Sequence, residues 1–144
     1  MSFTPVGGGG LLSGVTIAAQ GIKPGIRIIA AEPKGADDAA RSKAAGKIIP
    51  QAAPNTIADG LLTSLGDLTW PIVRDRVERV VTVSDPEIVG AMRLMWERAK
   101  LLIEPSAAVA VAAVLSDEFK SLPGLRSVGI VLSGGNANLD KLPW

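Results

Sequence analysis

The chain has 144 residues, 47% of them hydrophobic, a formal net charge of +1, and no cysteine, histidine or tyrosine. Disulfides, thiolate nucleophiles, histidine-based triads and zinc centres built on His or Cys are therefore excluded, which leaves acid–base chemistry to Lys, Asp, Glu or hydroxyl groups. The balanced charge argues against a nucleic-acid partner, and the absence of an apolar stretch of membrane-spanning length predicts a cytoplasmic protein with no membrane partner.

Short apolar runs alternate with helical patterns along the whole chain. This alternation predicts an α/β fold in which a parallel sheet is flanked by helices through right-handed crossovers. The first predicted helix places Leu11, Leu12, Val15, Ala18 and Ala19 on one apolar face. The predicted strands are residues 3–6, 26–31, 77–83 and 128–132; the predicted helices are residues 11–20, 37–45, 57–64, 87–100, with a cap at Ser84 or Asp85, and 106–115; residues 50–54 are predicted to be irregular.

Four consecutive glycines, Gly7, Gly8, Gly9 and Gly10, lie between the first predicted strand and the first predicted helix. Without Cβ atoms, successive backbone N–H groups of such a turn can converge on an anion at the helix N-terminus. Neither the dinucleotide fingerprint nor the Walker A pattern is met, because Ser13 stands at the third glycine position of the first and Val15 at the lysine position of the second. The loop thus favours a small terminal phosphate, such as that of pyridoxal phosphate, over a flexible linker, which is the alternative.

Three turns of the chain follow predicted strands. They contain the glycine run, Glu32 and Ser133. Because ligands of parallel α/β sheets bind at the carboxyl ends of the strands, we expect these turns to lie at one edge of the sheet. The first strand is short and the sheet is small, which indicates that the chain is part of something larger.

Five segments in order, VGGGGLLSG, IIAAEPKGADDA, NTIADGL, WERAKLLIEPSAAVAVAAVLS and GIVLSGGN, are similar to the pyridoxal-phosphate-dependent serine/threonine dehydratase family, which has the tryptophan-synthase-β-like fold of the fold-type-II enzymes. The resemblance runs from about Pro5 to Asn138. It implies that residues 1–144 are a single partial domain, the C-terminal part of the large cofactor-binding domain. It also implies that the small domain and the Schiff-base lysine lie outside the chain, so that no catalytic residue is present here.

The resemblance further implies how this chain contacts the cofactor. The four glycines and the N–H of Leu11 would hold the 5′-phosphate of pyridoxal phosphate. Gly60 would let the backbone approach the cofactor ring, Ser133 would face the pyridine nitrogen, and Thr63 would lie near the substrate. For Ser133 the alternative is an ordinary Ser-Gly-Gly turn that ends a strand.

Two regulatory sites are also implied by the resemblance. Glu32 and Asp38, with the carbonyl of Ala36, match a site for Mg²⁺, Ca²⁺ or Mn²⁺, which take hard oxygen ligands. Asp37 beside Asp38 leaves that choice open, and two solvated acids are the alternative.

Lys100 and Asn136 match contacts to ATP as an effector, and Arg98 adds positive charge. For Arg98 and Lys100 the alternative is an ordinary polar helix face near its C-terminus, where the helix dipole stabilises positive charge.

The activity implied for the intact protein is racemisation of serine to D-serine together with serine and threonine ammonia-lyase activity, in a homodimer that acts on these small amino acids. Residues 1–144 alone are expected to be inactive. One rival is threonine dehydratase, which normally continues into a regulatory domain after this region. The other is a non-catalytic α/β module that binds an anion at the glycine loop.

Overall fold

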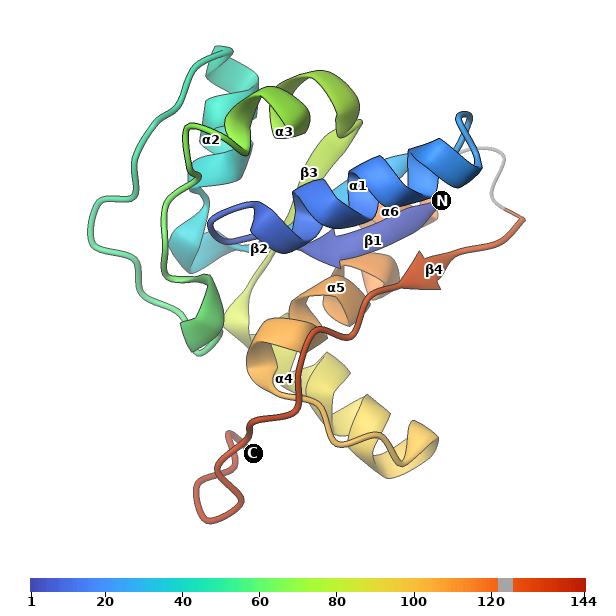
Figure 1. Ribbon diagram of the computed structural model, residues 1–144. Helices are drawn as coiled ribbons and strands as arrows, with labels where there is room; N and C mark the ends of the chain where they lie inside the picture. Colours follow the sequence, from blue (N-terminus) through green and yellow to red (C-terminus); the bar gives the residue numbers. More distant parts are fainter. Residues whose placement is uncertain (122–125) are drawn as a thin grey trace.

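The computed structural model describes residues 1–121 and 126–144, and these form a four-stranded parallel sheet with helices on both faces (Figure 1). The strand order is β3-β2-β1-β4, and every neighbouring pair is parallel, which confirms the predicted α/β class. The last strand is shorter than predicted, although the N–H of Val131 extends its ladder by donating to Phe3 O at 2.9 Å. The strands are β1 (Ser2–Pro5), β2 (Ile28–Pro33), β3 (Arg79–Val83) and β4 (Gly129–Ile130).

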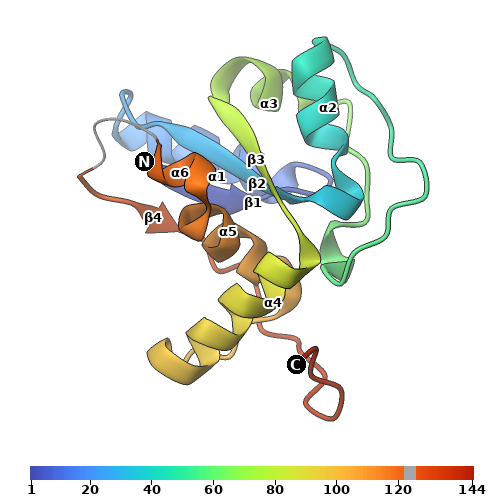
Figure 2. The same ribbon diagram turned by 180° about the vertical axis from the view of Figure 1, so that it is seen from behind.

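The helices divide between the two faces of the sheet, as Figures 1 and 2 show from opposite sides. On one face lie α1 (Gly10–Ile22), α2 (Asp38–Ala45) and α3 (Trp70–Arg76). On the other lie α4 (Asp85–Leu94), α5 (Pro105–Leu115) and α6 (Asp117–Lys120). Short helical turns occur at Lys34–Ala36 and Asp59–Leu61, and a π-helical turn, Met95–Ala99, prolongs α4. In the described part of the chain, no helix is both long enough and apolar enough to cross a bilayer.

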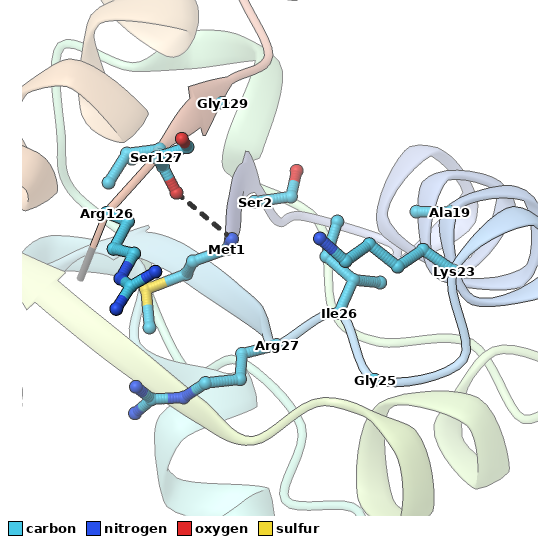
Figure 3. A pocket seen from close by; sticks show the side chains of 11 residues that line it. Met1, Ser2, Ala19, Lys23, Gly25, Ile26, Arg27, Arg126, Ser127 and Gly129 are labelled. Carbon is cyan, nitrogen blue, oxygen red and sulfur yellow. Dashed lines mark hydrogen bonds between the residues drawn. The ribbon is translucent and has the colours of Figure 1, made fainter. Parts of the chain in front are cut away.

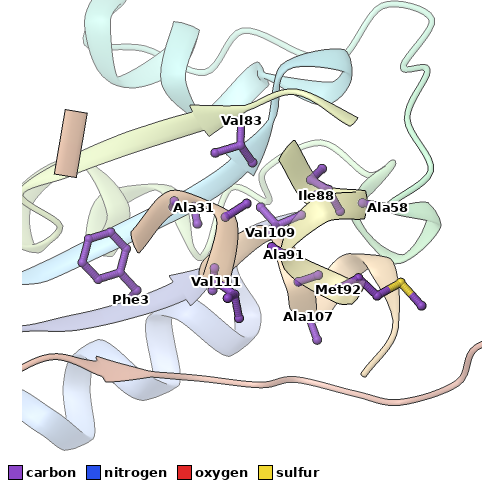
Figure 4. Packing of buried hydrophobic residues seen from close by; sticks show 14 of the residues in the cluster. Phe3, Ala31, Ala58, Val83, Ile88, Ala91, Met92, Ala107, Val109 and Val111 are labelled. Carbon is purple, nitrogen blue, oxygen red and sulfur yellow. The ribbon is translucent and has the colours of Figure 1, made fainter. Parts of the chain in front are cut away.

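The core is divided by the sheet into two clusters. Because side chains of a strand alternate between its faces, Ile29 and Ala31 of β2 join the cluster under α5, whereas Ile28 and Ala30 join the cluster under α1. Helix α5 is buried all round from Ser106 to Ala113, and its small residues let it pack closely against β1 and β2 (Figure 4). An unbroken apolar stretch with no polar face is what such a position requires.

Helix α4 begins where its sequence predicts. Ser84 is its N-cap, the backbone N–H of Ser84 donates to Glu87 Oε2 at 2.7 Å, and Pro86 occupies the first turn. This capping box with an early proline satisfies N–H groups that a helix start otherwise leaves unpaired. The cap predicted at Ser84 or Asp85 is therefore confirmed at Ser84.

The segment 57–64, predicted to be a helix, forms only the short turn Asp59–Leu61, so that prediction was wrong. Its backbone groups bind side chains of neighbouring helices: Ile57 N–H donates to Asp85 Oδ2 at 3.1 Å, and Gly60 N–H donates to Ser106 Oγ at 3.0 Å. Side-chain acceptors of this kind compete with the helical hydrogen bonds. Helices α3 and α6 were not predicted.

The buried face of α1 also differs from the predicted one. Leu12 is buried, but Leu11 is 48% exposed and Ala18 is exposed, while the polar residues Ser13 and Thr16 are buried. The hydroxyl of Thr16 donates to Leu12 O at 2.7 Å, and this internal partner lets a polar side chain face the sheet. Hydrophobic periodicity cannot detect such a residue.

Candidate active site

A pocket of about 220 Å³ lies beyond the carboxyl end of β1, where the glycine loop enters α1. The structure thus brings together Gly60, Ser133 and the glycine loop, which are far apart in the sequence, while their roles remain a prediction. The pocket is lined by Pro5, Gly7, Gly8, Gly9, Gly10, Leu11, Leu12, Gly60, Leu61, Glu104, Ser106 and Ser133.

The glycine loop presents a row of backbone donors without acceptors. Gly9 is the N-cap of α1 with a left-handed φ of 86°, and its carbonyl accepts the first helical hydrogen bond, from Ser13 N at 2.9 Å. Within the described residues, no protein acceptor takes the N–H groups of residues 7–12. Unpaired N–H groups at a helix N-terminus, where the helix dipole is positive, form a binding site for an anion.

The requirement for glycine in this loop comes from the segment 63–69 behind it. A Cβ on Gly9 would lie 2.6 Å from Thr69 Oγ1, and a Cβ on Gly7 would lie 3.1 Å from Thr63 Oγ1. A Cβ on Gly10, by contrast, would meet nothing within 4 Å. Gly7 and Gly9 are therefore glycine because the protein packs closely against them, a constraint independent of any bound phosphate.

Ser133 follows β4 and is held through the residues after it. Glu104 N–H donates to Gly134 O at 3.1 Å, and Glu104 Oε2 accepts the N–H of Asn136 at 2.9 Å. A Cβ on Gly134 would lie 2.7 Å from Glu104 Oε1, so this turn rests directly on the start of α5. Glu104 was not predicted as a site residue, although it is the one ionisable side chain among the described residues that line the pocket. The only sequence signal for Glu104 was its position directly before Pro105, at the start of a helix.

Of the other two predicted contacts, only Gly60 lines the pocket. Its N–H is held by the hydroxyl of Ser106, a residue only 3% exposed that sequence reasoning missed. The hydroxyl of Thr63 lies beside Gly7 and Gly8. Thr63 itself is not among the residues that line the pocket.

Glu32 and Asp38 form a buried acidic pair at the end of β2 and the start of α2. Glu32, at 0% exposure, accepts the N–H groups of Ala39 and Ala40 at 2.8 and 2.9 Å, at the start of α2. Asp38, at 1% exposure, accepts Gln51 Nε2 at 3.1 Å and Leu65 N at 2.8 Å.

The buried acidic pair has no direct ion-pair partner among the described residues, although Arg41 acts on Asp38 from a greater distance. Burial raises the pKa of Glu32 to about 8 and also raises the pKa of Asp38. Removal from water disfavours the charged form of a carboxyl group, so a bound cation would relieve the cost of both ionised side chains.

The donor set suits a divalent cation that keeps water ligands. The side chain of Asp37 pairs with Arg41 at 2.7 Å and is 42% exposed, whereas Asp38 is buried like Glu32. Ala36, whose carbonyl was the third predicted ligand, is also buried. No cluster of three or more His, Cys, Asp or Glu side chains occurs in the described part. Two carboxylates and a carbonyl, completed by water, match the habits of Mg²⁺.

Of the three residues predicted to contact ATP, only Asn136 lines a cavity described here. Asn136 lines a cavity of about 590 Å³ together with Asp59 and Lys141, whereas Lys100 and Arg98 are not among its described lining residues. Lys100 ends the π-helical turn with a φ of 57°, and its Nζ donates to Glu97 O at 2.8 Å.

A second cavity, of about 670 Å³, lies at the opposite end of the sheet (Figure 3). It surrounds the start of β1, where Met1 N donates to Ser127 O at 3.2 Å, and it is lined by Lys23, Arg27 and Arg126. Arg27 forms an ion pair with Glu78 at 2.6 Å. Because ligands of such sheets bind at the carboxyl ends of the strands, size alone does not make this cavity the candidate site.

The amino-acid sequence of this chain is similar to sequences of known proteins. Residues 2–134 match the family described as "Pyridoxal-phosphate dependent enzyme". Serine racemase from Arabidopsis thaliana is 60% identical over 141 residues, which are 96% of this chain and 43% of that protein. The chain therefore spans less than half of the length of this relative.

Solved structures agree with the sequence comparison. The structure of maize serine racemase superposes with a TM-score of 0.94 at 56% identity, covering 96% of this chain and 43% of that one. The serine racemase from Dictyostelium discoideum superposes with a TM-score of 0.91 at 51% identity, covering 96% of this chain and 44% of that one. A threonine deaminase from T.th. superposes with a TM-score of 0.88 at 43% identity, covering 95% of this chain and 50% of that one.

Proposed function

Because the chain belongs to the family of pyridoxal-phosphate dependent enzymes, we propose that it is part of a serine racemase that also has serine and threonine ammonia-lyase activity. The observation that carries the proposal is the row of unpaired N–H groups in the glycine loop, which lines the same pocket as Ser133. The high identity to serine racemases supports the choice of activity within the family. By the same resemblance, the complete enzyme is a homodimer.

The residues present fit pyridoxal phosphate. The N–H groups of the four glycines and of Leu11 bind its phosphate, and Gly60 lets the backbone lie close to the ring. When bound, the cofactor supplies an electron sink for negative charge at the substrate Cα. The hydroxyl of Ser133 donates a hydrogen bond to the ring nitrogen but is too weak an acid to protonate it, which suits racemisation and elimination of water better than transamination.

The residues of this chain bind and orient rather than move the Cα proton. No lysine lies among the described residues that line the pocket. We therefore assign the cofactor-anchoring lysine, and with it the Cα base, to a part of the enzyme outside residues 1–144. Thr63, whose hydroxyl lies beside Gly7 and Gly8, is the residue that we place near the substrate.

Two further ligands belong to the proposal. Mg²⁺, Ca²⁺ or Mn²⁺ binds the carboxylates of Glu32 and Asp38 and the carbonyl of Ala36, where it neutralises buried charge and holds the start of α2. ATP acts as an effector through Asn136, with Lys100 and Arg98 as cationic contacts. Lys100 and Arg98 are not among the described residues that line the cavity of Asn136, so we assign further contacts of the effector site to other parts of the assembly.

Titration of the purified chain with pyridoxal 5′-phosphate and with pyridoxal, followed by absorbance, tests the cofactor site. We expect binding that depends on the phosphate group. Equal affinity for the two compounds would contradict the role of the glycine loop. In the complete enzyme, a chiral assay for D-serine and a coupled pyruvate assay test the activity directly.

The alternative function is that of a threonine dehydratase, and the close superposition of a threonine deaminase supports it. The complete enzyme distinguishes the two, because a dehydratase would form no D-serine while it consumes threonine. A non-catalytic anion-binding module is distinguished by borohydride reduction with pyridoxal phosphate. One stoichiometric lysine adduct in the complete protein identifies an enzyme.

A further inference from the structure

The segment that crosses behind the glycine loop is bonded to it at a single atom, the carbonyl oxygen of Gly8. Thr69 Oγ1 lies 2.7 Å from Gly8 O, and Gly66 N–H donates to the same oxygen at 3.2 Å. Thr69 Oγ1 is also 3.0 Å from Gly66 O. Since a hydroxyl has only one proton to donate, the shorter contact, to Gly8, is the better hydrogen bond.

This bond sets the direction of the next N–H group. In a planar trans peptide, the carbonyl and the following N–H point in opposite directions. The Gly8 carbonyl points to Thr69 and Gly66, so the N–H of Gly9 points away from them. Gly8 and Gly9 line the pocket, whereas Thr69 does not. If this peptide flipped, a carbonyl oxygen would replace an N–H donor in front of an anion.

A loop of four glycines cannot hold such an orientation by itself. Glycine reaches positive and negative φ with similar ease, and every fixed residue loses conformational entropy. Gly9 nevertheless has a φ of 86°, and the closest atom that its Cβ would meet is Thr69 Oγ1. The hydroxyl of Thr69 is therefore in contact with both residues that share the peptide.

The segment 63–69, which lies behind the glycine loop, is itself held by hydrogen bonds. Leu65 N–H donates to Asp38 Oδ2 at 2.8 Å, and Trp70 N–H donates to Gly66 O at 2.9 Å. Trp70 begins α3 and is only 8% exposed. A hydroxyl presented from this position is preorganised, which lowers the entropy lost when a ligand binds.

We propose that Thr69 is a positioning residue of the phosphate site: its hydroxyl holds the Gly8–Gly9 peptide so that the Gly9 N–H is directed into the pocket. The inference rests on the proposed function, in which the anion is the phosphate of the cofactor. It adds a residue 61 positions from Gly8 that touches no ligand and acts through the peptide alone.

The test compares Thr69→Val, which keeps the shape and removes the hydroxyl, with Thr69→Ser, which keeps the hydroxyl. Each full chain is titrated with pyridoxal 5′-phosphate, inorganic phosphate and pyridoxal. We expect Thr69→Val to bind the two phosphate-bearing probes about tenfold more weakly, as the loss of one well-placed hydrogen bond implies. Its affinity for pyridoxal stays unchanged, and Thr69→Ser binds all three within about twofold of the wild type.

The outcomes separate this inference from the proposed function. If the wild-type chain binds neither phosphate-bearing probe, the proposed function and the inference both fail. If the wild type binds them and Thr69→Val binds them equally well, only the inference fails. Should Thr69→Val lose its circular dichroism signal, the pair Thr69→Ala and Thr69→Ser replaces it. The readout is then the shift of the Gly9 amide resonance on adding phosphate, expected with serine and absent with alanine; an equal shift in both overturns the inference.

Discussion

Asp38 accepts a 2.8 Å hydrogen bond from the N–H of Leu65, and this bond connects the first turn of α2 with the segment that supports the glycine loop. The next residue, Gly66, donates to the carbonyl of Gly8. Two successive hydrogen bonds therefore join the buried acidic pair to the candidate phosphate site. A cation bound at Glu32 and Asp38 would stabilise the same structure that the cofactor requires.

Asp38→Ala should destabilise the chain by about 1–3 kcal/mol, because it leaves the buried N–H of Leu65 without its acceptor. The neighbouring Asp37→Ala is a matched control, since Asp37 is 42% exposed and its ion pair with Arg41 lies near the surface. Urea unfolding followed by tryptophan fluorescence measures both. Equal losses in the two variants would show that the Asp38–Leu65 bond contributes nothing specific.

Glu32 should make the stability of the metal-free chain depend on pH. Its pKa is about 8 in the folded chain against an ordinary value of 4.5, because burial disfavours its charge. The folded state thus retains a proton that the unfolded state has released, so stability falls as the pH rises from about 4.5 to 8. The loss over this interval is roughly a few kcal/mol. Unfolding at a series of pH values in EDTA measures it.

Glu32→Gln and added Mg²⁺ separate the causes of that loss. The amide side chain of this variant cannot ionise, so the variant should show a flatter profile across the same interval. Mg²⁺ should reduce the loss in the wild type and have little effect in Glu32→Gln. A wild-type profile that is already flat in EDTA would show that the pKa of Glu32 is not raised, and a cation effect that survives in the variant would show that Glu32 is not a cation ligand.

Gly9→Ala should destabilise the chain by more than about 1 kcal/mol and weaken its binding of pyridoxal 5′-phosphate. The added Cβ would lie 2.6 Å from Thr69 Oγ1 at a φ of 86°, which disfavours side chains. Gly14→Ala is the matched control: it lies in α1 with nothing within 4 Å of its Cβ, and should stabilise the helix by about 0.5–1 kcal/mol. Thermal unfolding and absorbance titration check both. Normal cofactor affinity in a folded Gly9→Ala chain would contradict a phosphate site in the glycine loop.

The sheet was predictable because buried parallel strands are short apolar runs between turns, and all four predicted strands differ from the structure by at most two residues at either end. The glycine loop and Ser133 were predictable for a related reason. Topology places the carboxyl ends of neighbouring parallel strands at one edge, so turns distant in sequence line one pocket.

The supporting residues were not predictable in the same way. Thr69 and Ser106 act through single hydroxyl groups that bind backbone atoms far away in the sequence, and no local pattern reports such a contact. The wrong prediction of a helix over residues 57–64 has the same cause, because N–H groups of this segment donate to the side chains of Asp85 and Ser106 instead of to helical carbonyls. The partners of a loop are known only once the fold has brought them together.

Ser133→Asp in the complete enzyme should lower racemase and elimination rates by at least about tenfold, because a carboxylate facing the ring nitrogen favours its protonated form. Ser133→Ala should cost less than about tenfold in cofactor affinity, as expected for one neutral hydrogen bond. The absorbance spectrum of the bound cofactor against pH reports the protonation state directly. Spectra and rates that are identical in all three proteins would place Ser133 away from the ring nitrogen.

Residues 1–144 alone should show no racemase or ammonia-lyase turnover above the rate of free cofactor, even though they bind pyridoxal phosphate. The pocket offers donors for the phosphate and a hydroxyl at Ser133, but no lysine among its described lining residues. Binding without a positioned base leaves the barrier to proton transfer largely in place. The edge strand β4, with Val128 and Ile130 each 36% exposed, should also make the isolated chain associate. A chiral serine assay and a coupled pyruvate assay, with pyridoxal phosphate, Mg²⁺ and ATP added, decide the matter. Clear turnover would mean that one of the lysines of this chain, rather than a residue outside it, serves as the base.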